Sequence, residues 1–255
     1  MKRFCYLILS AFVLLAGIAY WLSVSQAQSP EPRSILEKTI EAHGGAENIG
    51  KPRMGILKGI SKGDGPEIPQ EETFDLPKRW KRVTSATLDG KRRVSFDLMV
   101  DGKLWQWDDG IEPQETPNTA NAQPYFAIVS LLLHLTKEKV KLTRLQKTKV
   151  NGDSAAGFRA TWDSSTAADY YFDAKTGLLV QSRFTFQSQA GKDLATKTVY
   201  TDYKDDDGVM LARRRTTYVK GGEFKDYVLL TDYLVTEVRI LNTIANDVFS
   251  LPGKK

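Results

Sequence analysis

One segment of the chain has the spacing of a serine nucleophile. Gly59-Ile60-Ser61-Lys62-Gly63 fits the G-x-S-x-G pattern, which in hydrolases places a serine on a strained turn between a strand and a helix. That chemistry also needs an acid and then a histidine downstream. Here Asp64-Gly65-Pro66 and another strand pattern follow, and the one downstream histidine, His134, falls in an apolar helical segment. We therefore interpret the match as a chance feature of a hairpin and predict no catalytic residue and no enzyme activity.

Metal-binding side chains are too sparse for a metal centre. His43 and His134 are the two histidines and Cys5 is the one cysteine, so a zinc site with nitrogen and sulfur ligands is not expected. Asp202 and Asp205-Asp206-Asp207 lack the alternating acids of a calcium loop and are typical of a solvated turn. We predict no metal and no cofactor, and a structural role for His43 at a helix C-terminus.

The N-terminus indicates export. Lys2 and Arg3 precede an unbroken weakly polar to apolar run from Phe4 to Val24, and Ser25-Gln26-Ala27 then offers small residues at the positions that signal peptidase reads. The run exceeds the usual apolar region of ~7–15 residues and reaches the ~20 needed to span a bilayer. Two readings stay open for 1–27, a cleaved signal peptide or a retained anchor. Both place residues 28–255 outside the cytoplasm, in the periplasm or cell envelope, with 4–24 as the possible inner-membrane tether.

Charge and composition narrow the partners. The 255 residues carry a net charge of +5, and 41% hydrophobic with 26% charged residues is typical of a globular domain. Basic runs at Lys78–Arg82, Lys91–Arg93 and Arg213–Arg215 read as solvated strand faces, or alternatively as contacts to anionic lipid. Export excludes nucleic acid as a sensible partner. A domain without cysteine relies on burial for stability, and we expect a monomer.

Periodicity predicts one helix followed by many strands. Ser34-Ile35-Leu36-Glu37 has the form of a capping box, which predicts a helix over Ser34–His43 that Gly44-Gly45 ends. From Arg53 onward the period is two, with turn signals about every ten residues. Asp-Gly and Asn-Gly pairs supply the positive φ of two-residue hairpins. We predict about ten to twelve antiparallel strands in a sheet that curls, with one face inward.

One apolar segment interrupts the strands. After Pro124, residues Tyr125–Thr136 have helical spacing with apolar side chains on nearly every side, so the helix must be covered on nearly every side. A core helix that plugs the curled sheet and a lid over an apolar cavity both fit this pattern. The inward positions of the predicted strands are rich in aromatic side chains. This composition favours a packed core and also permits a cavity the size of a ligand.

Four sequence segments in this order resemble the LolA/LolB-like outer-membrane lipoprotein-sorting superfamily. They are Ala42–Gly45, Tyr171–Leu178, Tyr203–Val209 and Asp247–Pro252. The resemblance implies a mainly β (α+β) fold, a single curled antiparallel sheet that forms an unclosed β-barrel with helices over its mouth. It also implies a cavity for acyl chains and an arginine that holds the lid closed. Arg79, Arg82 and Arg93 are the candidates for that arginine by location, and the chain lacks the lipobox cysteine of the receptor branch.

The resemblance and the apolar pattern together give a functional hypothesis. We expect an exported, non-enzymatic carrier or binder of a hydrophobic ligand, such as a lipid or an acylated lipoprotein. The alternative is an envelope interaction or sensor module that uses the same barrel without a transported ligand. The candidate ligand-binding residues are Trp80, Phe96, Leu98, Trp105, Tyr125, Phe126, Val129, Leu132, Phe158, Trp162, Phe172 and Phe184.

Overall fold

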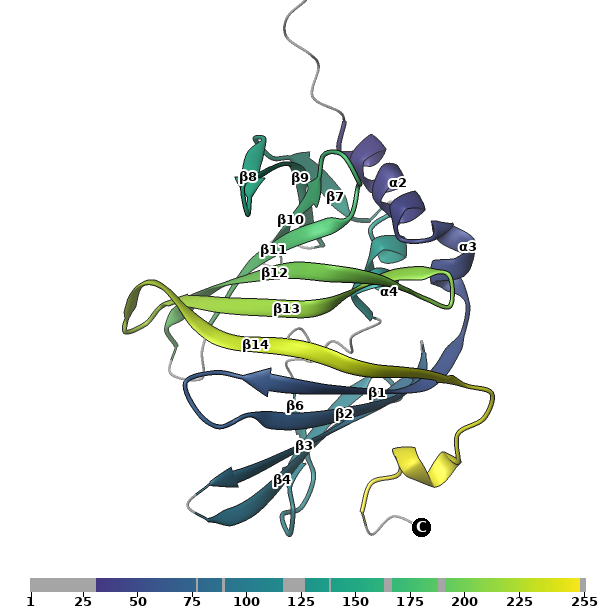
Figure 1. The fold of residues 1–255 in the computed structure, drawn as a ribbon, viewed down its shortest axis with the longest axis vertical. Helices are drawn as coiled ribbons and strands as arrows, with labels where there is room; N and C mark the ends of the chain where they lie inside the picture. The colour runs from purple at the N-terminus through teal and green to yellow at the C-terminus, as the bar shows by residue number, and fades with distance from the viewer. Residues whose placement is uncertain are drawn as a thin grey trace, which may run out of the picture. The chain divides into compact units, whose positions relative to one another are not determined.

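Figure 1 shows the computed structural model of the chain, which describes residues 31–76, 78–88, 90–116, 127–137, 139–162, 167–187 and 191–252. Residues Pro32–Lys255 form one compact unit, distinct from Met1–Glu31. The segment predicted to be a signal or an anchor lies outside the described residues, as do Tyr125 and Phe126. Within the described ranges, no helix has the length and apolar character needed to cross a bilayer.

Fourteen antiparallel strands of the described chain form one sheet. The order of neighbours is β6-β5-β4-β3-β2-β1-β14-β13-β12-β11-β10-β9-β7, with β8 paired to β9. The path is open, because its two ends, β6 and β7, do not pair with each other. The strands are β1 (Arg53–Lys62), β2 (Ile68–Leu76), β3 (Arg79–Leu88), β4 (Lys91–Val100), β5 (Lys103–Asp108), β6 (Gln114–Thr116), β7 (Lys141–Arg144), β8 (Thr148–Val150), β9 (Asp153–Thr161), β10 (Ala167–Asp173), β11 (Leu179–Gln187), β12 (Asp193–Asp206), β13 (Val209–Gly221) and β14 (Phe224–Leu241).

The predicted fold class, a curled antiparallel sheet that does not close, is confirmed. Eleven of the strands have six residues or more, which agrees with the expected ten to twelve. The additional strands β6, β7 and β8 have three or four residues each, too few for a period of two to be visible in the sequence. Asp101, Asn151 and Asp207 each have a φ of 52–55° and precede a glycine with positive φ, as the Asp-Gly and Asn-Gly signals predicted.

In the part of the chain that the structure describes, three helices and one 3-10 turn accompany the sheet. They are α2 (Pro32–Ala42), α3 (Gly45–Gly50), α4 (Ala127–His134) and η1 (Asn246–Phe249). The prediction of a capping box was wrong: α2 begins at Pro32, so Ser34 lies within its first turn. Proline suits the first helical position because its φ is already helical and its missing N–H would have no partner there. The predicted apolar helix is confirmed over Ala127–His134.

The two faces of the sheet have separate cores. Residues paired across antiparallel strands share a face, and neighbours along a strand alternate faces. Trp80 pairs with Met99, which pairs with Leu104, and these side chains belong to the core beneath α2, α3 and α4. We call this the inner face. Its most deeply buried side chains include Leu36, Leu57, Phe74, Trp80, Leu104, Leu132, Leu135, Phe158, Phe172 and Leu211.

The outer face has a smaller core. Leu98 and Trp107 alternate with inner-face residues on β4 and β5 and are buried with Phe249 of η1. Phe96 stacks on Trp107 with ring centroids 5.0 Å apart. The C-terminal segment is attached through Arg79, whose Nη2 donates to Oδ1 of Asn246 at 2.7 Å. The C-terminus therefore seals an apolar patch on the outside of β3–β5 and leaves the inner face to the helices.

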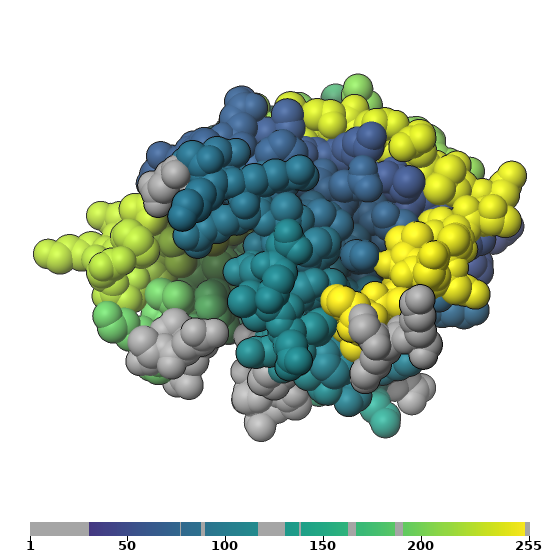
Figure 2. All heavy atoms as spheres, turned by 90° about the horizontal axis from the view of Figure 1, so that it is seen from below, coloured from purple at the N-terminus to yellow at the C-terminus, as the bar shows by residue number. Residues whose placement is uncertain are grey.

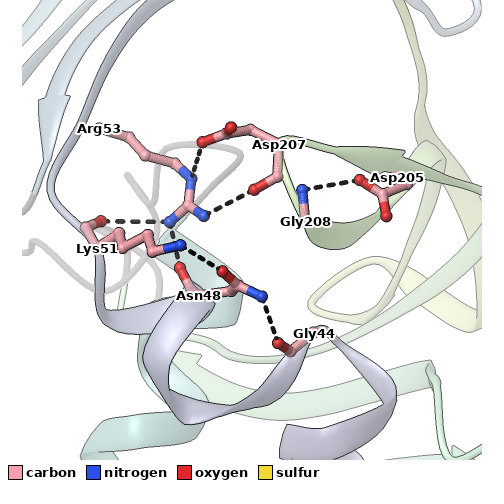
Figure 3. Close-up of polar contacts among 7 residues, drawn as sticks. All are labelled: Gly44, Asn48, Lys51, Arg53, Asp205, Asp207 and Gly208. Atoms are coloured by element: carbon pink, nitrogen blue, oxygen red, sulfur yellow. Dashed lines mark hydrogen bonds and ion pairs between the residues drawn. The ribbon is translucent and has the colours of Figure 1, made fainter.

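A buried arginine fixes α3 to the turn between β12 and β13 (Figure 3). Arg53 is buried, and its guanidinium donates to the carbonyl oxygens of Asn48, Lys51 and Asp207. Its Nε also lies 3.5 Å from Oδ2 of Asp207. Burial lowers the pKa of Arg53 and the Asp207 carboxylate opposes that shift. Three backbone acceptors from two distant segments thus share one cation.

The helix junction approaches the same turn through a glycine. Gly44 has a φ of +114°, and a Cβ built on it would lie 2.0 Å from the carbonyl oxygen of Gly208. Nearby, the N–H of Met210 donates to the carbonyl oxygen of His43 at 3.2 Å. The predicted helix stop at Gly44 is confirmed, and the close backbone approach gives a second reason for glycine at that position.

We predict that Gly44→Ala lowers the free energy of unfolding by about 2–4 kcal/mol, because alanine adds both backbone strain and a clash with Gly208. Urea unfolding of the purified domain measures the change. Gly65→Ala is the matched control, since Gly65 has open space around its Cβ position. It should leave the stability within about 1 kcal/mol of wild type. Equal effects of the two substitutions would contradict the tight junction.

Candidate ligand-binding face

The inner face carries a layered pattern of side chains along its strands. Nearest the helices lies an apolar layer, in which Leu57, Phe74, Trp80 and Val235 pack with Leu132 of α4 in one continuous core. Gly55 of β1 makes room for this layer, because a Cβ there would lie 2.6 Å from the ring of Phe74. In the described residues this layer is filled by the protein's own side chains.

A row of polar side chains, contributed by seven strands, follows the apolar layer. Strand pairing aligns Glu72 with Arg82, Arg82 with Asp97, and Arg215 with Tyr233. We define the polar row by its members in strand order. They are Gln106, Asp97, Arg82, Glu72, Tyr233, Arg215 and Tyr200.

Hydrogen bonds and ion pairs hold the polar row in place. Arg82 donates from Nε to Oδ2 of Asp97 at 2.7 Å, and Gln106 donates to Oδ1 of the same carboxylate at 2.6 Å. The guanidinium of Arg215 lies 4.7 Å from the centroid of the Tyr233 ring. Cation–π contacts of this kind strengthen when they are desolvated. The row is therefore a fixed network of charges inside the curled sheet.

Tyr233 lies at the centre of the polar row. Its side chain is 5% exposed, and its ring rests on Gly59, where a Cβ would lie 2.5 Å from the hydroxyl. Burial and then the nearby Glu72 carboxylate raise the pKa of Tyr233, while Arg215 and Arg82 lower it. The hydroxyl therefore stays protonated and can act as a hydrogen-bond donor.

Hydroxyl side chains continue the inner face beyond the polar row. Ser61 hydrogen-bonds to Thr231, and Thr198 Oγ1 lies 3.0 Å from Thr217 Oγ1. Polarity thus changes along the strands from apolar at the helices, through charged, to hydroxyl-lined. In the space-filling view the surface is hollowed between the yellow-green hairpin of β13 and β14 and the teal middle of the chain (Figure 2).

The structure gathers part of the predicted ligand-binding set on the inner face. Trp80, Leu132, Phe158 and Phe172 are buried in the inner core, and Trp162 and Phe184 pack partly buried against it. These six come from β3, α4, β9, the end of β9, β10 and β11. Val129 lies on α4. The inner core is therefore built from elements across the whole chain.

Phe96, Leu98 and Trp105 are on the opposite face. The alternation on β4 had the correct period, but the more apolar side of the strand faces outward. The inner face of β4 carries Asp97 and Met99 instead, because the C-terminal segment covers the outer side. An apolar alternation gives the period of a strand and not the identity of the layer that covers it. The apolar residues in and around η1 were the sequence signal that could have indicated a second core on the outer face.

The three candidate arginines separate in the same way. Arg82 is the one placed among the buried side chains of the inner face, with its guanidinium 5.5 Å from the centroid of Trp80. Arg79 is on the outer face and holds the C-terminal segment. Arg93 is exposed near the hairpin of β3 and β4.

The other residues considered for catalysis or metal binding do not form a reactive site in the described ranges. Ser61 lies within strand β1, not on a strand-to-helix turn, which agrees with the interpretation of the G-x-S-x-G match as chance. No group of three or more His, Cys, Asp or Glu residues suited to a metal ion occurs in the described ranges. His134, in the predicted apolar segment, is exposed. The arrangement is suited to binding an amphipathic molecule.

Comparison with solved structures places this open, helix-covered sheet among known folds. It is similar to a LolA-superfamily protein from Nitrosomonas europaea, with 13% sequence identity and a TM-score of 0.53 over 87% of this chain and 98% of that one. It is also similar to a putative outer membrane lipoprotein-sorting protein domain from Vibrio parahaemolyticus, with 12% identity and a TM-score of 0.50 over 85% and 94%. The fold resemblance predicted from the sequence is therefore confirmed. No protein-family model and no curated protein matches the chain.

His43 gives a testable pH dependence. Its Nδ1 lies 2.9 Å from the carbonyl oxygen of Thr39. The centroids of the His43 and Tyr203 rings are 5.8 Å apart in a T-shaped arrangement. Burial lowers the pKa of His43. The unfolded chain, with a histidine pKa near 6.5, therefore binds more protons than the folded chain just below that pH. The stability that depends on neutral His43 is therefore fully present above about pH 6.5. It falls as the pH decreases from there toward the pKa of His43 in the folded protein.

We predict that protonation linked to His43 lowers the free energy of unfolding by up to about 1.4 kcal/mol for each pH unit below about pH 6.5. Urea unfolding between about pH 5.5 and 7 measures the slope. His43→Gln should flatten it, and His134→Gln, at the exposed histidine, should retain it. A wild-type slope that persists in His43→Gln would assign the pH dependence to other groups.

Proposed function

We propose that the chain is an exported, non-enzymatic protein of the cell envelope that binds the acyl chains of a lipid or a lipoprotein on the inner face of its open barrel. The fold likeness carries this proposal, since one similar structure is described as a lipoprotein-sorting domain and matches over most of both chains. The N-terminal pattern of Lys2, Arg3 and the apolar run to Val24 supports export. We further propose that the protein acts as a monomer.

An acyl chain can replace apolar side chains at little cost. Helix α4 contributes Leu132 to the inner core and the turn after it contributes Leu135, so withdrawal of this segment would expose apolar surface that a ligand can cover again. Each buried methylene contributes ~0.8 kcal/mol, so a chain of about fourteen would gain roughly 11 kcal/mol before the costs of binding. Such an exchange needs no polar recognition motif, which fits the absence of one in the sequence.

The basic runs are mostly occupied within the domain. Arg213 pairs with Asp206, Arg214 makes two hydrogen bonds to Asp232, and Arg215 belongs to the polar row. Lys91–Arg93 is the run that stays exposed, at the β3–β4 hairpin. We propose that this run makes the peripheral contact if the protein binds to an anionic membrane.

The division of the predicted aromatic residues between two faces gives a matched test of ligand binding. We predict that Phe184→Ala, on the inner face, weakens binding of a fluorescent fatty-acyl analogue by about tenfold or more, because a phenylalanine side chain offers ~1.5–3 kcal/mol of apolar contact. Phe96→Ala makes the same substitution on the outer face and should leave the affinity unchanged. Fluorescence titration of the purified proteins measures both.

Circular dichroism of both variants establishes that they are folded. Equal loss in the two variants, or no binding by the wild type, would oppose an acyl site on the inner face.

A second candidate function rests on strand β14. Of the eight large hydrophobic side chains exposed in the described residues, six lie between Phe224 and Leu234 on this strand. Pairing of β14 with β1 stops at Asp232, so one edge of Phe224–Leu230 has no strand beside it in the described chain. We call Phe224–Leu230 the β14 arm; it belongs to the projecting yellow-green hairpin in Figure 2. A free edge with apolar side chains suits an added strand from a partner protein.

For this second function we expect the protein isolated from its native envelope to carry one partner in stoichiometric amount. Leu230→Lys, at the most exposed large hydrophobic residue of the arm, should release that partner. Ile111→Lys is the control at an exposed apolar residue outside the arm and should retain it. Mass spectrometry of the intact complexes distinguishes the outcomes, and retention by both variants would exclude the arm as the contact.

A further inference from the structure

The hydroxyl of Tyr233 is a buried donor without an acceptor. Among the described residues no group hydrogen-bonds to it, although Tyr233 is only 5% exposed. A buried polar group left unpaired usually costs about 1–3 kcal/mol relative to a paired one. Gly59 makes space for this ring because it lacks a Cβ, so the place of the Tyr233 ring depends on the residue type at position 59 as well. The unpaired donor therefore points to a missing acceptor.

The surrounding charges limit which acceptor fits. Within the polar row, Arg82 and Arg215 provide two positive charges, and Glu72 and Asp97 provide two negative charges. Arg82 is already engaged by Asp97 through a 2.6 Å contact between Nη2 and Oδ2. A ligand group with its own net charge would enter a balanced and partly buried network, where an unmatched charge is costly. A neutral acceptor such as a carbonyl oxygen adds a hydrogen bond without disturbing the balance.

The residues on either side of Tyr233 indicate how a bound molecule that carries this acceptor would be oriented. On one side of the hydroxyl lie the apolar residues Leu57 and Val235, and on the other lie Ser61 and Thr231 of the hydroxyl-lined region. A molecule with an apolar tail, a neutral carbonyl and a polar end matches this order of layers. Its tail would lie toward the helices and its polar end toward the hairpins.

We propose that the Tyr233 hydroxyl donates to the carbonyl oxygen of an acyl ester or acyl amide and thereby selects linked acyl chains over free fatty acids. This inference rests on the proposed acyl-binding function and names the chemical class of its ligand. Tyr233 is then a specificity-determining residue, while the apolar layer supplies most of the affinity.

The test compares two probes on two variants. The probes are a fluorescent long-chain acyl ester and the matched ether, in which a methylene replaces the carbonyl. We expect Tyr233→Phe to bind the ester about fivefold to tenfold more weakly than wild type and to bind the ether equally well. Tyr227→Phe is the control on the same strand, at an exposed tyrosine, and should change neither affinity.

The stability of Tyr233→Phe checks the premise separately. Removal of an unpaired buried hydroxyl should leave the urea midpoint at or above that of wild type, whereas a lower midpoint would show that the hydroxyl has a partner in the free protein and would overturn the inference. Wild-type binding of ester and ether with no selective loss in Tyr233→Phe would overturn the carbonyl site and leave the acyl-binding function intact. Binding of neither probe would remove both.

Discussion

The pairing of β1 with β14 is the constraint on which the rest of the structure depends. It joins the meander β1–β6 to the meander that ends in β14, and so makes one sheet from two halves of the chain. The register shifts between Lys58 and Gly59, next to the place where Tyr233 lies across the glycine. Because side chains alternate along a strand, this register decides which residues of β1 and β14 lie side by side on the inner face. This pairing brings Tyr233 of one half near the Glu72 carboxylate of the other half.

The inner face therefore combines two opposite demands. The apolar layer under the helices stabilises the fold by burial, whereas the polar row costs free energy unless its charges are paired. Arg82, Asp97 and Gln106 meet that condition through direct contacts. A sheet selected for stability alone would do as well with apolar residues at these positions, since buried ion pairs rarely exceed hydrophobic replacements in stability. The presence of the network next to an apolar layer favours a role in recognising an amphipathic ligand.

Much of the fold followed from local signals, and the orientation of its parts did not. Asp101-Gly102 and Asn151-Gly152 identified hairpins because positive φ is a property of single residues. The inward direction of β4 could not be derived, because Asp97 faces inward only through partners on β3 and β5, and Phe96 faces outward only because of a segment 150 residues later. The placement of Tyr233 was equally hidden, since it depends on Gly59 across the pairing of β1 with β14. Periodicity records alternation and contains no information on what covers each side.

The attachment of the helices sets how the inner face can open. Helix α3 is held by Arg53, which bridges carbonyl oxygens of Asn48, Lys51 and Asp207, and its withdrawal would leave a buried cation and its acceptors unpaired. Among the described residues, buried leucines hold α4, and Arg33 donates an exposed hydrogen bond to the carbonyl oxygen of Thr136 just after the helix. An acyl chain can restore the contacts that α4 loses, but no apolar ligand can restore those of Arg53. Within the acyl-binding proposal, displacement of α4 with α3 fixed is therefore the opening that costs least among the described contacts.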